Sequence, residues 1–132
     1  MMVRCLDGLA EIALAAGDIR HCRAYGDKLL AVAQPNGLRE LEAAARRWRG
    51  EAMLAEKDYA EAQTELSSAA ALAENIGRVR LQMDTQAALA RMFAAQGQRD
   101  AAQRHDATAR AIAETIEMSL ESSGLEARLR MS

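Results

Sequence analysis

Two histidines are the side chains of this 132-residue chain best suited to transfer a proton or hold a metal ion. His21 is followed by Cys22, and His105 is followed by Asp106. Adjacent residues of a helix do not face each other, so neither pair forms an acid–base couple. A metal site would need further His, Cys or carboxylate ligands at a defined spacing, and no second pair of that kind occurs. We therefore expect no catalytic residue, no metal and no cofactor, and interpret Cys22 as a small buried apolar residue.

The short motifs that cradle phosphate or expose a nucleophile are also missing from the sequence. Neither a glycine-rich phosphate loop nor a Gly-x-Ser-x-Gly turn is present. We expect a protein that is not an enzyme. Activity of the purified chain that is lost on His21→Ala or His105→Ala would contradict this expectation.

A basic cluster at residues 46–49 reads Arg-Arg-Trp-Arg and could contact nucleic acid through phosphate binding and base stacking. Acidic residues four positions away weaken that interpretation. The pairs Glu42–Arg46 and Arg47–Glu51 have the spacing of ion pairs on a solvated helix face. The net charge of −2 provides no general attraction to nucleic acid or anionic lipid, so we expect neither partner.

Trp48 is the only tryptophan of the chain, and two interpretations of it remain open. Trp and Arg are favoured anchors in protein interfaces, which would make Trp48 the centre of a binding surface. Alternatively, the ring packs between helices and only its N–H reaches a polar partner. Because most of a Trp side chain is apolar, the sequence favours neither interpretation over the other.

The elements that position these residues recur along the chain at a fixed period. Residues 17–22 align with residues 57–62 and 97–102, and Gly37 aligns with Gly77. A constant period in this range is typical of stacked helical pairs. Aromatic residues make up 3% of the chain and proline occurs once, which fits an all-α fold with closely packed helices. We therefore predict three units in one domain.

The units are expected at residues 1–37, 38–77 and 78–117, followed by a capping tail at 118–132. Their first helices are expected at 4–16, 38–56 and 78–96, and their second helices at 19–33, 59–75 and 99–117. Asp18 and Asp58 are placed to cap the helices that follow them. Gly17 and Gly97 are placed in turns that need a positive φ. In the tail, Ser123 followed by Glu126 fits a capping box, which predicts a short last helix over 125–131 that covers the end of the stack.

The turn residues at 17–22 and 57–62 resemble those of the tetratricopeptide repeat. Gly50 and Ala90 stand where that family keeps a small residue, and the period of about 40 exceeds the family's usual 34. The resemblance implies a right-handed superhelical array of antiparallel helix pairs. It is closest to repeat regions at the C-terminal end of bacterial signalling proteins, of which residues 46–52 and 87–93 are the most similar segments. HEAT and armadillo units have a comparable length and remain the competing interpretation.

In such an array the first helices line a concave groove, so the resemblance implies that a partner segment binds there. The expected groove residues are Asp7, Glu11, Arg47, Trp48, Glu51, Asp84 and Arg91. We expect a regulatory or scaffolding module that binds a protein or peptide, with Trp48 as anchor and the charges setting the register.

The N-terminal edge of the array supports a second hypothesis, self-association. An apolar edge around Val3, Leu6, Leu9 and Ile12 could pair with a second copy, or could be the cut end of a longer protein. With no apolar run of membrane-spanning length and no signal-peptide pattern, we expect a cytoplasmic protein with reduced cysteines.

Overall fold

The computed structural model describes residues 2–131, together with the side chains of residues 6–122 and the surroundings of Gly124. Six α-helices and no strand make up this part of the chain, which confirms the all-α class. The helices are α1 (Met2–Ala15), α2 (Ile19–Ala33), α3 (Arg39–Ala55), α4 (Tyr59–Asn75), α5 (Val79–Ala95) and α6 (Arg99–Met131). Up to residue 99, every expected helix boundary lies within two residues of the observed one.

The first five helices all end in the same turn, and this turn recurs at a constant interval along the chain. The residues with positive φ are Gly17, Gly37, Lys57, Gly77 and Gly97. At the third turn the Lys57 N–H donates to the Leu54 carbonyl at 3.0 Å, and the Asp58 N–H donates to the Met53 carbonyl at 2.9 Å. This pair of bonds defines the Schellman motif, which satisfies carbonyls left free at a helix end. The structural unit is therefore one helix plus one turn, half of the period seen in the sequence.

The expected aspartate caps are present in one of the two cases. The Asp18 Oδ1 accepts a hydrogen bond of 3.3 Å from the His21 N–H at the start of α2. Asp58 occupies the same position before α4, but its side chain makes no capping bond. The backbone turn alone therefore suffices to start α4.

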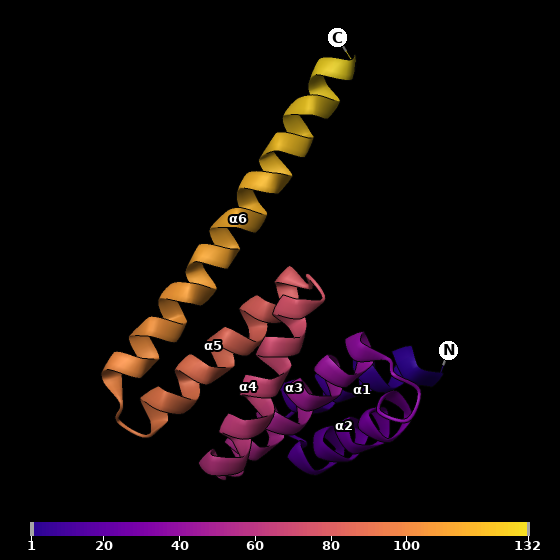
Figure 1. Ribbon diagram of the computed structural model, residues 1–132, viewed down its shortest axis with the longest axis vertical. Coiled ribbons are helices and arrows are strands. Elements are labelled where there is room, and N and C mark those ends of the chain that lie inside the picture. The colour runs from indigo at the N-terminus through magenta and orange to yellow at the C-terminus, as the bar shows by residue number, and fades with distance from the viewer. Residues whose placement is uncertain (1, 132) are drawn as a thin grey trace.

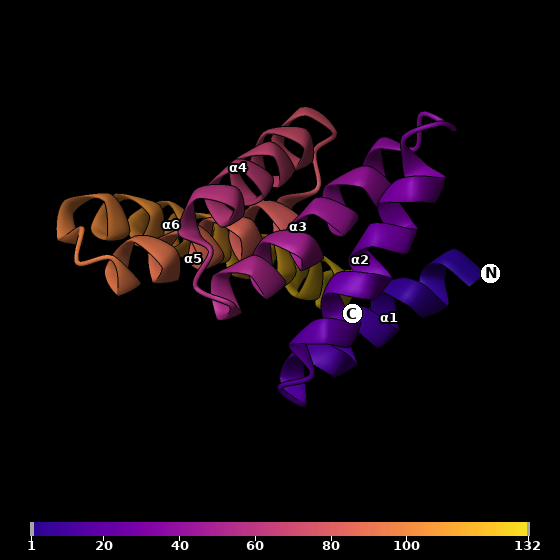
Figure 2. The same cartoon turned by 90° about the horizontal axis from the view of Figure 1, so that it is seen from below.

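Each helix packs against the next along the chain, and α3 also contacts both α1 and α5. Figure 1 shows these helices as a sequential stack, with α6 leaving it at one end. The view from below in Figure 2 shows α3 between the α1–α2 pair and the α4–α5 pair. The helices α1, α3 and α5 thus form one continuous row.

Two small apolar clusters hold the stack together. The first joins α1, α2 and α3 around Leu29, Trp48 and several buried alanines. The second joins α3, α4 and α5 around Met53, Leu66 and Met92. One face of α4 is apolar, because Ala62, Leu66, Ala69 and Ala73 are spaced by three and four positions and are fully buried.

Glycines let α3 approach both of its neighbours closely. A Cβ added at Gly50 would lie 2.7 Å from Leu66 Cγ on α4, which is too close for any real contact. A Cβ added at Gly26 on α2 would lie 2.9 Å from Arg49 Cγ and 3.3 Å from the Ala45 carbonyl oxygen. Gly26 therefore lets the α2 backbone lie directly against α3, with no side chain between them.

The prediction of a separate capping helix over 125–131 is wrong. The helix α6 runs without interruption from Arg99 to Met131 and extends beyond α5 (Figure 1). Gly124 lies inside this helix and, unlike the turn glycines, does not have a positive φ. One glycine inside a helix costs about 1 kcal/mol, which is too little to end it without a competing turn. The backbone at residue 123 is helical, so no new helix starts there, and the tail at 118–132 does not fold back over the stack in its described part.

Candidate interaction site

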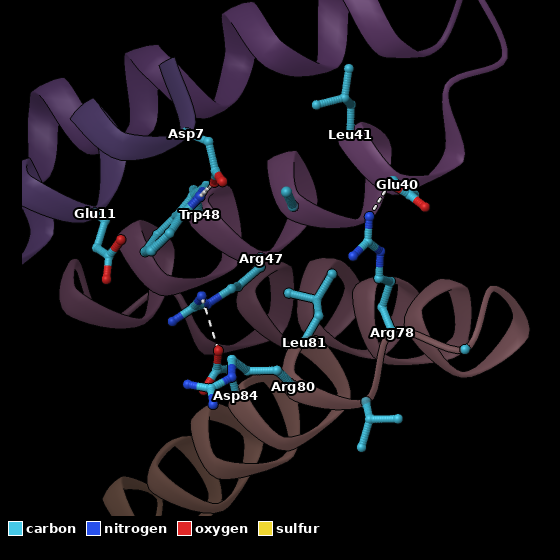
Figure 3. A pocket seen from close by; sticks show the side chains of 13 residues that line it. Asp7, Glu11, Glu40, Leu41, Arg47, Trp48, Arg78, Arg80, Leu81 and Asp84 are labelled. Atoms are coloured by element: carbon cyan, nitrogen blue, oxygen red, sulfur yellow. Dashed lines mark hydrogen bonds and ion pairs between the residues drawn. The ribbon is translucent and has the colours of Figure 1, made fainter. Parts of the chain in front are cut away.

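An open pocket of about 520 Å³ lies on the row formed by α1, α3 and α5 (Figure 3). Five of the seven expected groove residues line it: Asp7 and Glu11 from α1, Arg47 and Trp48 from α3, and Asp84 from α5. The other two expected residues, Glu51 and Arg91, pair with each other between α3 and α5 outside this pocket.

Trp48 forms part of the pocket wall but belongs to the core, because only 2% of it is exposed. Its indole N–H donates to the Asp7 Oδ1 at 2.5 Å across the α1–α3 contact. The Arg47 guanidinium lies over the ring at 4.1 Å from its centroid, in cation–π geometry. Of the two interpretations left open, the structure shows the one in which Trp48 packs between helices and its N–H reaches a polar partner.

Ion pairs along the row connect first helices rather than residues of one helix. The expected Arg47–Glu51 pair is not among the described ion pairs, because Arg47 Nη1 lies 3.3 Å from Asp84 Oδ2 on α5. Glu51, which is 4% exposed, instead accepts from Arg91 Nη2 at 2.7 Å. Arg47 and Glu51 each pair with a residue of α5, so the four-residue spacing on α3 does not decide their partners.

The rest of the basic cluster points to the opposite side of α3. The buried carboxylate of Glu65 on α4 accepts from Arg46 Nη1 at 3.3 Å and pairs with Arg49 Nη1 at 3.0 Å. Arg46 also pairs with Glu42 at 3.1 Å, which confirms that expected pair, and Arg49 pairs with Asp27 on α2 at 2.9 Å. These arginines are thus neutralised within the protein and join α2, α3 and α4.

The pocket floor is apolar and its two sides differ in charge. Its apolar lining residues include Leu41, Ala44 and Leu81. Leu81 lies between Arg47 and Arg78, and Leu41 lies beyond Glu40 (Figure 3). The α1 side carries Asp7 and Glu11, a formal charge of about −2 at neutral pH. On α3, Glu40 and Arg47 balance each other. The α5 side carries Arg78 at its leading turn, Arg80 and Asp84, a formal charge of about +1.

Some of these lining charges are matched within the protein and some are not. Arg78 pairs with Glu40 through a short ion pair at the pocket rim, and this contact lowers the pKa of the Glu40 carboxyl. Within the described part of the chain, Glu11 and Arg80 have no ion-pair partner within 4 Å. Glu11 and Arg80 are therefore the lining charges best placed to meet charges of a ligand.

We did not predict the pocket residues at the starts of α3 and α5, namely Glu40, Leu41, Ala44 and residues 77–81. The repeat alignment contained a usable signal, because Leu41 and Leu81 are one period apart and occupy the same position in two units. Glu40 and Arg80 are equivalent in the same way. Apolar and charged residues recurring together at one repeat position mark a shared surface on the row of first helices.

The residues considered for chemistry are dispersed. His21 Nδ1 lies 2.6 Å from Asp18 Oδ2 on α2, while His105 on α6 stacks on Phe93 at 5.3 Å between ring centroids. Burial lowers the pKa of His105. Burial also raises the pKa of the Cys22 thiol to about 11, so this thiol is inert at neutral pH.

No family model, curated protein or solved structure matches this chain. Among residues 2–131, no helix has both the length and the apolar character needed to cross a bilayer. The described side chains contain no group of three residues arranged to hold a metal ion. The geometry of the pocket therefore provides the basis for a functional proposal.

Proposed function

We propose that this protein is a non-catalytic interaction module that binds an extended segment of a partner protein across α1, α3 and α5. In this proposal the six helices form a tetratricopeptide-like, right-handed superhelical array with the row of first helices on its concave side. A regulatory or scaffolding role in bacterial signalling, in the cytoplasm, is the corresponding biological setting. Rigid display of a prearranged surface would be the mechanism, as in other stacked repeats.

One observation carries this proposal: a single pocket is lined by side chains from three successive first helices. Its floor is apolar, its sides carry charges of both signs, and Glu11 and Arg80 lack described ion-pair partners. Apolar surface gives a ligand affinity, and placed charges give it a register. The buried Trp48 side chain holds two lining residues in place. It donates a hydrogen bond to Asp7, and its ring packs against the Arg47 guanidinium.

The experiment is a peptide-library selection on the immobilised full chain, compared with a variant of the pocket floor. Leu81→Asp places a carboxylate on the floor, whereas the control Leu120→Asp changes a residue of α6 that is 65% exposed and does not line the pocket. We expect Leu81→Asp to lose the selected peptides and the control to keep them, with equal helicity by circular dichroism. Equal binding by both variants would contradict the proposal. Trp48→Ala is unsuitable as the test because it would leave a cavity in the core.

A specific observation also favours the alternative, self-association through α1. Ile12 is 67% exposed and Leu9 is 41% exposed on this first helix of the stack. Leu6 is half-buried and packs against the first apolar cluster, and the side chain of Val3 lies outside the described residues. The apolar edge is thus smaller than expected, but it is present.

Light scattering on Ile12→Glu tests the alternative, with Val32→Glu on α2 as the control at a residue that is 37% exposed. A dimer that becomes a monomer only with Ile12→Glu would support self-association. An unchanged mass would exclude this edge as a contact.

A further inference from the structure

The net formal charge of the pocket differs between its α1 side and its α5 side, and this difference limits which peptides it can accept. Asp7 and Glu11 lie on α1, while Arg80 lies on α5, one helical turn before Asp84 (Figure 3). Trp48 and Arg47, whose guanidinium pairs with Asp84, lie between the two sides.

A ligand crossing the row therefore meets the Glu11 carboxylate on one side and the Arg80 guanidinium on the other, and neither has an ion-pair partner among the described residues. Leu81 of the same pocket offers an apolar contact. A segment with charge of one sign at both ends would be repelled at one of them.

The span between the two sides sets the spacing of the ligand charges. Packed helices lie about 8–10 Å apart, so α1 and α5 are about 18 Å apart across α3. The Glu11 side chain points from α1 toward the α5 side and shortens that span, whereas the Arg80 side chain extends along α5 toward Asp84 (Figure 3). An extended chain advances about 3.4 Å per residue, and every second side chain points to the same face. Two long side chains four residues apart reach about 14 Å between their Cα atoms and can therefore contact both sides.

From this geometry we infer that the ligand is a dipolar extended segment, with a basic residue, an apolar residue and an acidic residue at alternate positions. The basic side chain lies against Asp7 and Glu11, the apolar side chain packs on Leu81, and the acidic side chain reaches Arg80. This inference rests on the proposed function and specifies the class of its partner. The direction of the ligand chain is an outcome of the test.

Labelled peptides with the cores Lys-Ser-Leu-Ser-Glu and Glu-Ser-Leu-Ser-Lys test the inference by fluorescence polarisation on the full chain. Comparison peptides carry Lys at both ends, Glu at both ends, or Ser at both ends. We expect one of the two dipolar peptides to bind about fivefold more tightly than any comparison peptide, the ratio of a charge contact of about 1 kcal/mol. Raising the salt concentration should reduce that ratio.

The variant Arg80→Glu makes both sides of the pocket acidic and gives the sharper result. Its preference should change to the peptide with Lys at both ends, while the control Arg104→Glu, an exposed residue of α6, should keep the preference of the parent chain. Equal binding of the Ser-ended and dipolar peptides, or an unchanged preference in Arg80→Glu, would overturn the inference. Selected library peptides without the alternating pattern would overturn it while leaving the proposed function intact. A library that yields no binder at all would overturn the proposed function itself.

Discussion

Lys57 is the one residue with positive φ among the described residues that is not a glycine, and replacing it should stabilise the protein. Its φ is 65°, and the equivalent positions in the other four turns are glycines with φ between 63° and 78°. The third turn therefore has the same geometry as the others with a side chain that disfavours it. The variant Lys57→Gly removes the Cβ that causes the strain.

The expected gain is the difference between two opposing effects. A Cβ in the left-handed region costs about 1–2 kcal/mol, and glycine avoids this cost. Glycine also makes the unfolded chain more flexible, which costs about 0.4–1 kcal/mol. Lys57 is exposed and makes no described ion pair, so no packing or ionic contact is lost. The net stabilisation should be about 0.5–1 kcal/mol, or about 3 °C in Tm for a chain of this size.

Urea denaturation followed by circular dichroism measures this gain as a change in the midpoint at constant slope. Lys57→Ala is the matched control, because alanine keeps the Cβ and should not produce the gain. Gly77→Ala in the next turn should destabilise the protein by a comparable amount. Destabilisation by Lys57→Gly, or equal gains from glycine and alanine, would refute the explanation by backbone strain.

Three further predictions concern the core and the row of first helices. Gly50→Ala should destabilise the fold by about 1–3 kcal/mol in urea denaturation, because the new Cβ would lie 2.7 Å from Leu66 Cγ. Adding Leu66→Ala should reduce that loss, and additive effects of the two substitutions would contradict the explanation by this clash. Arg91→Met should lower the free energy of unfolding by about 1–2 kcal/mol, because it removes the ion-pair partner of the buried Glu51 carboxylate. Adding Glu51→Gln should recover part of that stability, and no recovery would show that the charge of Glu51 is not the cause. Burial raises the pKa of Cys22 from its ordinary value of 9.0 to about 11, so the unfolded chain loses the thiol proton at a lower pH than the folded chain does. The stability contributed by this group is therefore complete below pH 9 and is lost as the pH rises toward 11. The difference in unfolding free energy between the parent chain and Cys22→Ala should shrink over that range, and a constant difference would contradict the assignment.

Local sequence signals predicted most of the helices because those signals agree with the packing. The expected range 59–75 is identical to α4, since Asp58 and Gly77 mark its ends and its apolar residues keep one face. The third turn shows how a signal can be hidden. Because residue 57 is Lys, the sequence does not show a glycine at every turn, and the period visible in the sequence is twice the period of the backbone turns.

Contacts between helices were harder to predict because spacing along one helix does not fix the register of its neighbours. Arg47 pairs with Asp84 at 3.3 Å across two helices, although Glu51 has the ideal spacing on its own helix. The site was predicted in part for the same reason. The repeat placed five pocket residues correctly on the row of first helices, but the burial of Trp48 depends on the close approach of α1, α2 and α3.

In the tail, a local sequence signal predicted a helix boundary that the structure does not have. Ser123 and Glu126 have the spacing of a capping box, yet α6 continues through them to Met131. A cap stabilises a helix start by about 1 kcal/mol, but only where the chain has already changed direction. The five real turns combine a positive φ with a backbone bond from the following residue to the carbonyl five positions earlier, and nothing at Gly124 supplies the positive φ.

The uniform turns also have a consequence for how the chain folds during its synthesis. Each helix contacts the next one along the chain, and α3 also contacts α1 and α5. The most distant described side-chain hydrogen bond joins residues 41 positions apart. Low contact order of this kind favours fast folding, because little loop entropy is lost before contacts form. At a synthesis rate of about 5–20 residues per second, one helix with its turn leaves the ribosome every 1–4 s. Trp48 can therefore reach Asp7 and close the first core before the helices of the second core are complete.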